Sequence, residues 1–418
     1  MEDEELDLRK LFYWVPLLTD PSHRRICICS SLPAAVLLCV IFFVGSALVT
    51  FNSNEKAPTW QAANYVETAK SPLPITPSEL CKNQNKPLGS ELLPRGIISE
   101  TSNLEMDTLG GSPEKKGHEK PSKSLLAIPA GIKQKEVVDK IVSKFPSTEF
   151  IVILFHYDGV VDKWGDLQWS DRIIHISVIN QTKWWFAKRF LHPDIVAEYN
   201  YIFLWDEDLD VKNFNPSRYL EIVKKEGLEI SQPALDGKKS QIHHRITARW
   251  GRGDVHRVLT TAENICVCVN RRIYKLNGGG RCYGNSTGPP CTGWVEMMAP
   301  VFSKAAWRCV WYMIQNDLIY AWGLDYKLGY CAQGDRTLNV GVVDREYVAH
   351  MGIPSLGGFL DENKVSPGST TSQDKDRYRV RHRSYEELKI FNKRWQKAAE
   401  DKCWTDPYPE QGKNSTNR

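Results

Sequence analysis

Residues 201–208 read YIFLWDED, a short apolar run that ends in three acidic residues. The apolar part is typical of a buried strand, and in open α/β sheets ligands bind beyond the carboxyl ends of the strands. Asp206 and Asp208 are separated by one residue, so both can face a hard divalent cation, Mg²⁺ or Mn²⁺, that also binds a substrate diphosphate. A solvated acidic loop is the alternative, and the preceding strand favours the metal site. The role of the nearby Asp210 stays open.

Apolar segments on both sides of this run predict a sheet whose strands alternate with helices. Strands are expected at 124–131, 150–155, 173–178 and 201–205, those at 150–155 and 173–178 being covered on both faces, and helices at 137–145 and, interrupted near Pro193, at 183–199. This alternation indicates an α/β fold with a largely parallel sheet. Further along the chain, helices are expected at 217–226, at 385–399 and over most of 301–322.

The N-terminal region predicts a membrane anchor. Residues 26–51 contain no charged residue, and a helix of about 20 apolar residues spans a bilayer. Arg24 and Arg25 precede this segment, which places residues 1–25 in the cytoplasm as a short tail. A cleaved signal peptide is the alternative, but its apolar core would be about 7–15 residues long. We therefore expect a single-pass type II protein with its bulk in a lumen.

The segment after the anchor is expected to be a disordered stem. Residues 52–122 are rich in Pro, Ser, Asn and Lys and sustain no hydrophobic period. A folded lumenal domain is then expected at 123–360, followed by a C-terminal extension with an amphipathic helix at 361–418. The stem would act as a flexible tether between the membrane and the domain.

Cysteines and glycosylation sequons fit a lumenal location. Eight cysteines follow the anchor, and an even number in an oxidising compartment indicates disulfides of unassigned pairing. The cluster from Cys266 to Cys291 has poor spacing for zinc. Sequons occur at Asn180, Asn285 and Asn414.

Composition argues against a nucleic-acid-binding protein, and the glycine pattern argues against a dinucleotide-dependent reductase. The chain is 42% hydrophobic and 25% charged, with a net charge of only +4, whereas nucleic-acid binders usually carry a strong basic patch. A dinucleotide fingerprint would need G-x-G-x-x-G directly after a strand, and Gly278–Gly280 follow no such strand.

Four residues outside the acidic run are candidates for the rest of the site. His350 ends a strand-like run and is the candidate third metal ligand, although a lone histidine is often structural. Asp325 is the candidate base that deprotonates an acceptor hydroxyl, and Asp317 is a further candidate. Glu296 is an isolated carboxylate in an apolar stretch, which indicates either an acceptor-side role in catalysis or a salt bridge in the core.

Donor binding has its own candidates, Asp158, Lys188 and Arg189. Asp158 follows the strand at 150–155 and could contact a base or ribose, but Asp-Gly is also a common turn pair. Lys188 and Arg189 belong to a basic aromatic segment that could reach a diphosphate. The alternative for this segment is tryptophan packing with solvated basic residues.

Several runs, among them ILFHYDG, YIFLWDEDLDVKNFNPSRYL, GPPCTGWVEMMAPVFS and WGLDYKLGYCAQGDRTLNVGVVD, resemble a plant family of unknown function. Its members often carry the label "lysine-ketoglutarate reductase trans-splicing related", and the resemblance covers about residues 123–405. The family is similar to type A glycosyltransferases, whose fold is a Rossmann-like sandwich with a mixed sheet. The resemblance implies a nucleotide-sugar donor, a Mn²⁺ or Mg²⁺ ion, Asp206 and Asp208 at the metal and the donor ribose, and His350 closing the metal shell.

Together these features predict a Golgi membrane glycosyltransferase that moves a sugar from a nucleotide-sugar to a glycan or glycoconjugate acceptor. A non-catalytic lumenal carbohydrate-binding protein on the same fold is the alternative. A glycoside hydrolase would need a carboxylate pair across a sugar cleft, and no local pattern identifies one.

Overall fold

The computed structural model describes Cys81 and residues 86–99, 123–240, 242–251, 253–258, 274–275, 281–282, 286–353 and 372–408. Within these ranges no helix combines the length and the apolar character that a membrane span requires. The expected tail at 1–25 and anchor at 26–51 lie outside the described residues.

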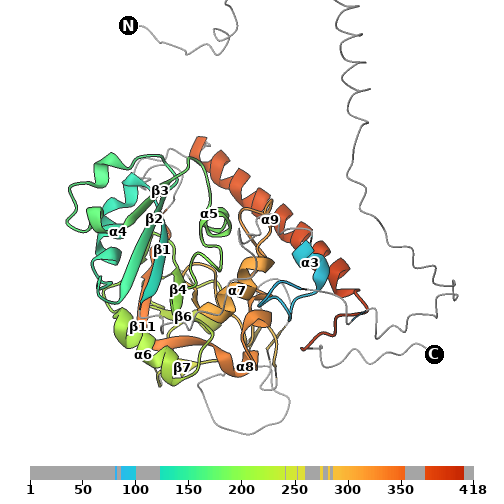
Figure 1. The fold of residues 1–418 in the computed structure, drawn as a ribbon. Helices are drawn as coiled ribbons and strands as arrows, with labels where there is room; N and C mark the ends of the chain where they lie inside the picture. The colour runs from blue at the N-terminus through green and yellow to red at the C-terminus, as the bar shows by residue number, and fades with distance from the viewer. Residues whose placement is uncertain are drawn as a thin grey trace, which may run out of the picture. The chain divides into compact units, whose positions relative to one another are not determined.

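A mixed sheet forms the centre of the fold, in the strand order β3-β2-β1-β4-β10-β6-β11-β5, with β7 also paired to β11 (Figure 1). Strands β1 to β4 are mutually parallel, as are β6 and β11, and β10 joins the two groups by running antiparallel to both β4 and β6. The predicted α/β class with a mixed sheet is therefore confirmed. The strands are β1 (Ser124–Ala130), β2 (Phe150–His156), β3 (Ile174–Ser177), β4 (Tyr201–Leu204), β5 (Leu209–Asp210), β6 (Ile230–Leu235), β7 (Val255–His256), β10 (Val301–Ser303) and β11 (Val340–His350), and β8 (Tyr274–Lys275) pairs separately with β9 (Arg281–Cys282).

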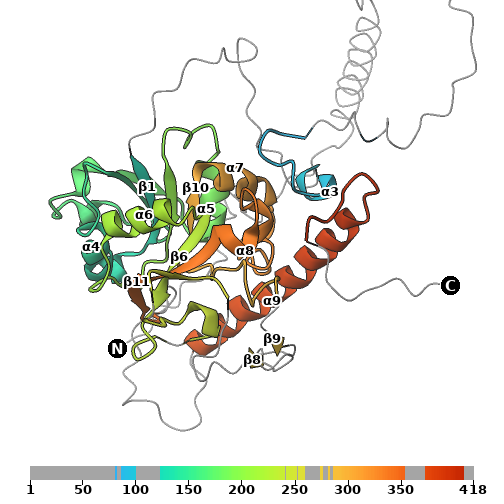
Figure 2. The same ribbon diagram turned by 90° about the horizontal axis from the view of Figure 1, so that it is seen from below.

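Helices cover both faces of this sheet. Figures 1 and 2 show α4 and α6 on one side and α5, α7 and α9 on the other. The α-helices are α3 (Arg95–Ser99), α4 (Lys135–Val142), α5 (Lys183–Phe190), α6 (Pro216–Lys225), α7 (Lys304–Met313), α8 (Arg336–Asn339) and α9 (Ser372–Ala399), and the 3₁₀ turns are η1 (Ile132–Gln134), η2 (Asp162–Trp164), η3 (Ser170–Arg172), η4 (Arg245–Thr247) and η5 (Leu328–Cys331).

The continuous apolar run before the acidic residues is explained by this double cover. Successive side chains of a strand point to opposite faces, so a strand covered on both faces is apolar throughout. Ile202 and Leu204 join the hydrophobic cluster under α5, α7 and α9, whereas Phe203 and Trp205 join the cluster under α4 and α6. All four side chains are fully buried.

Three predicted elements differ from the structure. Strand β3 lies at the edge of the sheet and leaves Ile174 44% exposed, so it is not covered on both faces. Helix α5 already ends at Phe190, before Pro193. The segment expected to be mostly helical at 301–322 begins with strand β10, and α7 starts only after it, where Ser303 caps the helix by accepting a hydrogen bond from the Ala306 N–H. The helix ends at Met313.

The folded domain also includes part of the expected stem. In the segment 86–99, Leu93, Ile97 and Ile98 are buried in the same cluster as α7 and α9. The expectation of a stem without a packed core is therefore wrong for residues 86–99. A disulfide between Cys81 and Cys403 adds a covalent link between this region and the C-terminal segment.

Helix α9, expected in a C-terminal extension, is likewise an integral part of the domain. Phe391, Trp395 and Ala398 are buried in the cluster that also holds α3 and α7. Two further disulfides, Cys282–Cys291 and Cys309–Cys331, confirm the expectation of disulfide bonds. Of the eight cysteines after residue 51, the remaining two, Cys266 and Cys268, lie outside the described residues.

The packing of residues 86–99 is testable with two substitutions in the same segment. Ile97 is 1% exposed, so Ile97→Ala should lower the free energy of unfolding by about 2–5 kcal/mol through lost burial and a cavity. Leu88 is 74% exposed, and Leu88→Ala should change it by less than about 0.5 kcal/mol. Denaturant unfolding of the protein and its two variants measures both values, and equal effects of the two substitutions would contradict the packed arrangement.

Candidate functional site

Asp206, Asp208 and His350 form the centre of the candidate site. One ligand atom from each residue lies within 4.8 Å of the others, and His350 Nε2 is 3.3 Å from Asp208 Oδ2. The two carboxylates follow the carboxyl end of β4, and His350 is the last residue of β11. Two carboxylate oxygens and one imidazole nitrogen are donors that Mn²⁺ or Mg²⁺ can accept, so the residues present fit a divalent cation.

A short antiparallel ladder brings these residues together. Strand β5 pairs with the end of β11, so that His350 lies opposite Leu209 and Ala349 opposite Asp210. Asp208 also accepts two backbone hydrogen bonds from the segment after β11, from the Met351 N–H to its carbonyl oxygen at 3.0 Å and from the Ile353 N–H to Oδ2 at 2.9 Å. The position of Asp208 is therefore fixed by the chain that carries His350.

Lys183 holds Asp206 from the other side of the site. Its ammonium donates to Asp206 Oδ1 at 2.5 Å and to the Met297 carbonyl oxygen at 2.6 Å, and the side chain is only 9% exposed. Burial raises the pKa of the Asp206 carboxyl, and the positive charge of Lys183 opposes that shift. Lys183 thus supplies a fixed counter-charge to the acidic residues.

Glu207, between the two aspartates, has a structural role. It is buried, and its Oε1 lies 3.1 Å from the hydroxyl of Tyr157, which follows β2. A side chain at Gly131 would not leave room for this tyrosine, because a Cβ there would lie 2.4 Å from the Tyr157 hydroxyl oxygen. Gly131 and Tyr157 therefore fix the middle of the acidic turn from the neighbouring strands.

A second pair of carboxylates, Glu296 and Asp325, lies beside the first. Burial raises the pKa of Glu296 to about 7, with smaller contributions from the negative charges of Asp325 and Asp206 and an opposing one from His350. Burial also raises the pKa of Asp325 to about 6, opposed by the Tyr326 backbone N–H and the nearby Trp294 indole. The charge of Glu296 is therefore coupled to those of Asp206, His350 and Asp325.

Glu296 is held by its backbone and leaves part of its carboxylate unpaired. Its N–H donates to Gln232 Oε1, in β6, at 2.5 Å. Within the described part of the chain, the buried Oε2 atom of Glu296 has no hydrogen-bond partner. An ionised carboxylate in that state is costly, which accounts for the direction of the pKa shift.

The predicted donor-binding residues are not gathered at this centre. Asp158 accepts hydrogen bonds from the Ile132 N–H at 2.6 Å and the Val160 N–H at 3.0 Å, which favours the turn alternative. Lys188 is buried against α7, where it donates to the Trp311 carbonyl oxygen at 2.8 Å. Arg189 is exposed, with its guanidinium 5.5 Å from the centre of the Trp185 ring.

The remaining carboxylates that were considered have other partners. Asp317 forms a bidentate ion pair with Arg394, with N–O distances of 2.6 and 2.7 Å. Asp210 Oδ2 lies 3.4 Å from Lys239 Nζ. Neither belongs to the Asp206–Asp208–His350 group.

Two site-forming residues, Gln232 and Ser240, were missed from the sequence. Gln232 positions Glu296, and Ser240 Oγ accepts a hydrogen bond from the His350 N–H at 2.9 Å. Both depend on the pairing of β6 with β11, and no local pattern around either residue signals that contact.

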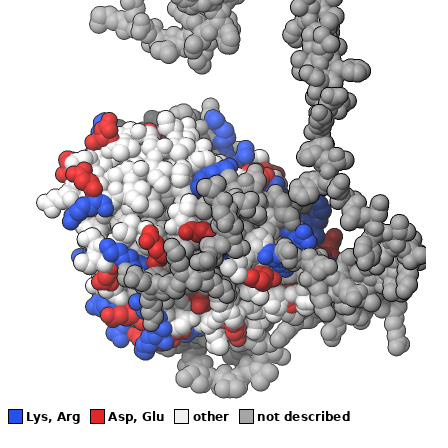
Figure 3. Space-filling model, in the orientation of Figure 1, with Lys and Arg blue, Asp and Glu red and all other residues white. Residues whose placement is uncertain are grey.

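Charges of both signs are interspersed on the described part of the face shown in Figure 3.

Comparison with known proteins identifies a family whose function is described as unknown. The family model described as "Protein of unknown function (DUF707)" matches residues 84–401. No curated protein shows significant similarity to the chain. Among solved structures, Staphylococcus aureus TarS residues 1–349 gives a TM-score of 0.31 at 9% identity over 54% of this chain and 59% of that one. A longer TarS chain gives a TM-score of 0.32 at 10% identity, over 54% of this chain and 36% of that chain. TarS 1–349 in complex with UDP also gives a TM-score of 0.32 at 10% identity, over 66% of this chain and 70% of that chain.

The raised pKa of Asp325 predicts a pH-dependent effect on stability. Because the folded protein binds this proton more tightly than the unfolded chain, ionisation of Asp325 costs stability as the pH rises from about 4 to above 6. Asp325→Asn removes that cost. The difference in free energy of unfolding, variant minus wild type, should therefore become more positive between these pH values, by on the order of 2 kcal/mol.

Asp317→Asn is the matched control with the opposite sign. Hydrogen bonding to Arg394 lowers the pKa of Asp317, so its ionised form stabilises the fold and the substitution should cost more at neutral than at acidic pH. Urea unfolding of both variants and of wild type at about pH 4 and about pH 7.5 measures the difference. A pH-independent effect of Asp325→Asn would contradict the burial of this carboxyl group.

Proposed function

Because this chain belongs to DUF707, a family of proteins of unknown function, we infer its activity from the site and propose that it is a metal-dependent glycosyltransferase. The reaction would move a sugar from a nucleoside diphosphate sugar to a hydroxyl group of an acceptor. The observation that carries this proposal is the Asp206–Asp208–His350 group at the carboxyl ends of β4 and β11, with two carboxylates of raised pKa beside it.

The first group of residues suits the leaving-group side of the reaction. A Mn²⁺ or Mg²⁺ ion held by Asp206, Asp208 and His350 would neutralise the charge of the departing diphosphate. Lys183 keeps Asp206 oriented and offsets negative charge at the same place. Partly buried groups interact more strongly than they would in water, so this arrangement favours binding of the diphosphate.

The second group suits the acceptor side. For transfer with inversion, the acceptor oxygen attacks the anomeric carbon, the bond to the diphosphate breaks with its electron pair leaving on the diphosphate, and the acceptor proton goes to a base. We assign the base to Asp325, since its pKa of about 6 leaves it ionised at neutral pH yet more basic than an ordinary aspartate. Glu296, which is coupled to His350 and Asp206 as well as to Asp325, would orient the acceptor.

The cellular place of the reaction is part of the same proposal. Three disulfides suit an oxidising compartment, and the apolar segment at 26–51 with its preceding arginines suits a type II anchor. We propose a Golgi membrane protein whose catalytic domain is lumenal and whose acceptor is a glycan or glycoconjugate.

Metal-dependent binding of a nucleoside diphosphate is the primary test. Calorimetric titration with a panel of nucleoside diphosphates, with and without Mn²⁺, should show at least one ligand whose binding requires the metal. Changing a residue that only orients a metal ligand costs roughly 10–100-fold in affinity, so Asp208→Ala and His350→Ala should each cost at least that much.

Asp210→Ala is the control, because Asp210 is acidic and close in sequence but outside the metal-binding group. It should leave the metal-dependent affinity within about twofold of wild type, as expected of a surface change. Absence of metal-dependent binding across the whole panel would overturn the proposal. Saccharide binding in its place would favour the non-catalytic carbohydrate-binding alternative.

Asp325→Asn should separate catalysis from donor binding. Loss of a general base lowers the turnover number by about 10²–10⁴-fold, while metal-dependent diphosphate binding should persist. In the wild type, turnover should fall as the pH drops below about 6, since the base must be ionised. Release of nucleoside diphosphate from the donor in the presence of acceptor measures both. Unchanged turnover in Asp325→Asn, with loss in Glu296→Gln, would move the base to Glu296.

A further inference from the structure

We propose that the turn formed by residues 320–326 is the acceptor subsite and that it takes a pyranose ring against the exposed faces of Trp322 and Tyr326. The inference rests on the proposed function, because it places the acceptor beside Asp325. Trp322 is 38% exposed and Tyr326 is 40% exposed, and both lie within three residues of Asp325.

The turn has an unusual backbone. Ala321 adopts a φ of 57°, which is uncommon for a residue with a side chain, and Gly323 adopts a φ of 95°. Such conformations persist only where the surroundings impose them, and they gather at functional sites. Contacts with other parts of the protein must therefore fix the backbone conformation of this turn.

Helix α9 makes several of the contacts that fix the turn. The Tyr320 N–H donates to Oε2 of the buried Glu387 at 2.8 Å, and a Cβ at Gly323 would lie 2.7 Å from Leu388 Cδ1. Arg394, further along the same helix, pairs with Asp317 just before the turn. The close approach at Gly323 shows that the turn lies directly on the helix.

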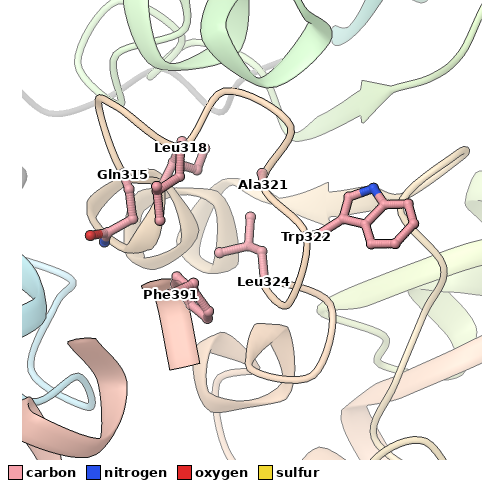
Figure 4. A pocket seen from close by; sticks show the side chains of 7 residues that line it. Gln315, Leu318, Ala321, Trp322, Leu324 and Phe391 are labelled. Atoms are coloured by element: carbon pink, nitrogen blue, oxygen red, sulfur yellow. The ribbon is translucent and has the colours of Figure 1, made fainter. Parts of the chain in front are cut away.

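The apolar side of the turn packs inward, and Trp322 does not. In the close-up of Figure 4, Leu318, Leu324 and Phe391 point toward one another around a small apolar hollow. The indole of Trp322 points away from them, and its ring centre is 4.9 Å from that of Tyr385 in an edge arrangement. The tryptophan thus packs against Tyr385 of α9 while 38% of its surface stays exposed.

The turn is also connected to the proposed catalytic groups. Thr182 caps α5 directly before Lys183 and donates its hydroxyl proton to the Ile319 carbonyl oxygen. On the other side, the Tyr326 ring centre is 6.5 Å from that of the buried Trp294, whose indole is near Asp325. The exposed rings therefore belong to a segment next to Thr182, the residue before Lys183, and next to Trp294, two residues before Glu296.

The chemistry of this segment favours a sugar over an apolar chain. A pyranose has an apolar C–H face that packs against a flat aromatic ring, and hydroxyl groups around its rim that donate hydrogen bonds to carboxylates. Binding sites for such ligands combine aromatic surface with a few well-placed polar groups. An acyl chain or an apolar peptide offers no hydrogen-bond donor to Glu296 Oε2, which has no partner among the described residues, and a buried carboxylate left in that state is costly.

Binding to an array of soluble oligosaccharides built from pyranose units tests the subsite, with Mn²⁺ and the preferred nucleoside diphosphate present. Wild type should bind a subset, and Trp322→Ala and Tyr326→Ala should each weaken that binding about tenfold or more. Trp322→Phe keeps an aromatic face and should retain most of the affinity. Tyr378→Ala is the control, since Tyr378 is an aromatic residue 70% exposed on α9 itself.

Metal-dependent diphosphate binding is measured on every variant and separates the two proposals. If it is intact while wild type binds no oligosaccharide, or while Trp322→Ala and Tyr326→Ala bind as well as wild type, the acceptor subsite is overturned and the proposed function stands. If diphosphate binding is absent in wild type, the proposed function fails, and the subsite as an acceptor site fails with it.

Discussion

The pairing of β5 with the last residues of β11 is the constraint on which the candidate site depends. A single two-residue strand turns the chain that follows β4 back onto the end of β11, and that places Asp208 against His350. The hydrogen bonds from Met351 and Ile353 to Asp208 fix the same contact a second time. Because β6 and β11 are parallel neighbours, the chain after β6 brings Ser240 to the His350 N–H, and Gln232 within β6 binds the Glu296 N–H. Without this ladder the acidic residues would be the solvated loop that their composition also allows.

Bringing several carboxylates together at a partly buried edge has an electrostatic cost, and the fold offsets it residue by residue. Lys183 binds Asp206, the Ile353 N–H binds Asp208, and the Tyr157 hydroxyl lies beside Glu207. Glu296 is the exception, since its Oε2 is buried with no hydrogen-bond partner among the described residues and its pKa rises to about 7. Strained or underpaired polar groups of this kind are typical of functional sites, where the missing partner belongs to a ligand.

Local sequence signals predicted much of the fold, and long-range contacts account for what they missed. The run YIFLW was correctly predicted as a buried strand, because its double cover leaves a continuous apolar pattern, and the aspartates and His350 were identified as a group. Lys188 was predicted to bind the donor, whereas the structure places Lys183 of the same helix against Asp206. Five residues at about 100° each separate them by about 140° around the axis, so one meets Asp206 and the other meets α7. Likewise, no composition signal marks residues 86–99 as folded, since their apolar side chains are few and their partner is α9, far away in the sequence.

The two ends of the described chain bear on the site through α9. The segment 86–99 is joined to the C-terminal region by the Cys81–Cys403 disulfide and by the hydrogen bond from Trp404 Nε1 to the Leu92 carbonyl oxygen at 2.9 Å. Helix α9 in turn holds the turn at 320–326 through Glu387 and through the close contact at Gly323. A turn whose backbone includes a left-handed alanine keeps its shape only while such contacts outweigh its strain. The parts of the chain that composition assigns to a stem and an extension therefore determine how rigidly Asp325 and its neighbouring aromatic rings are presented.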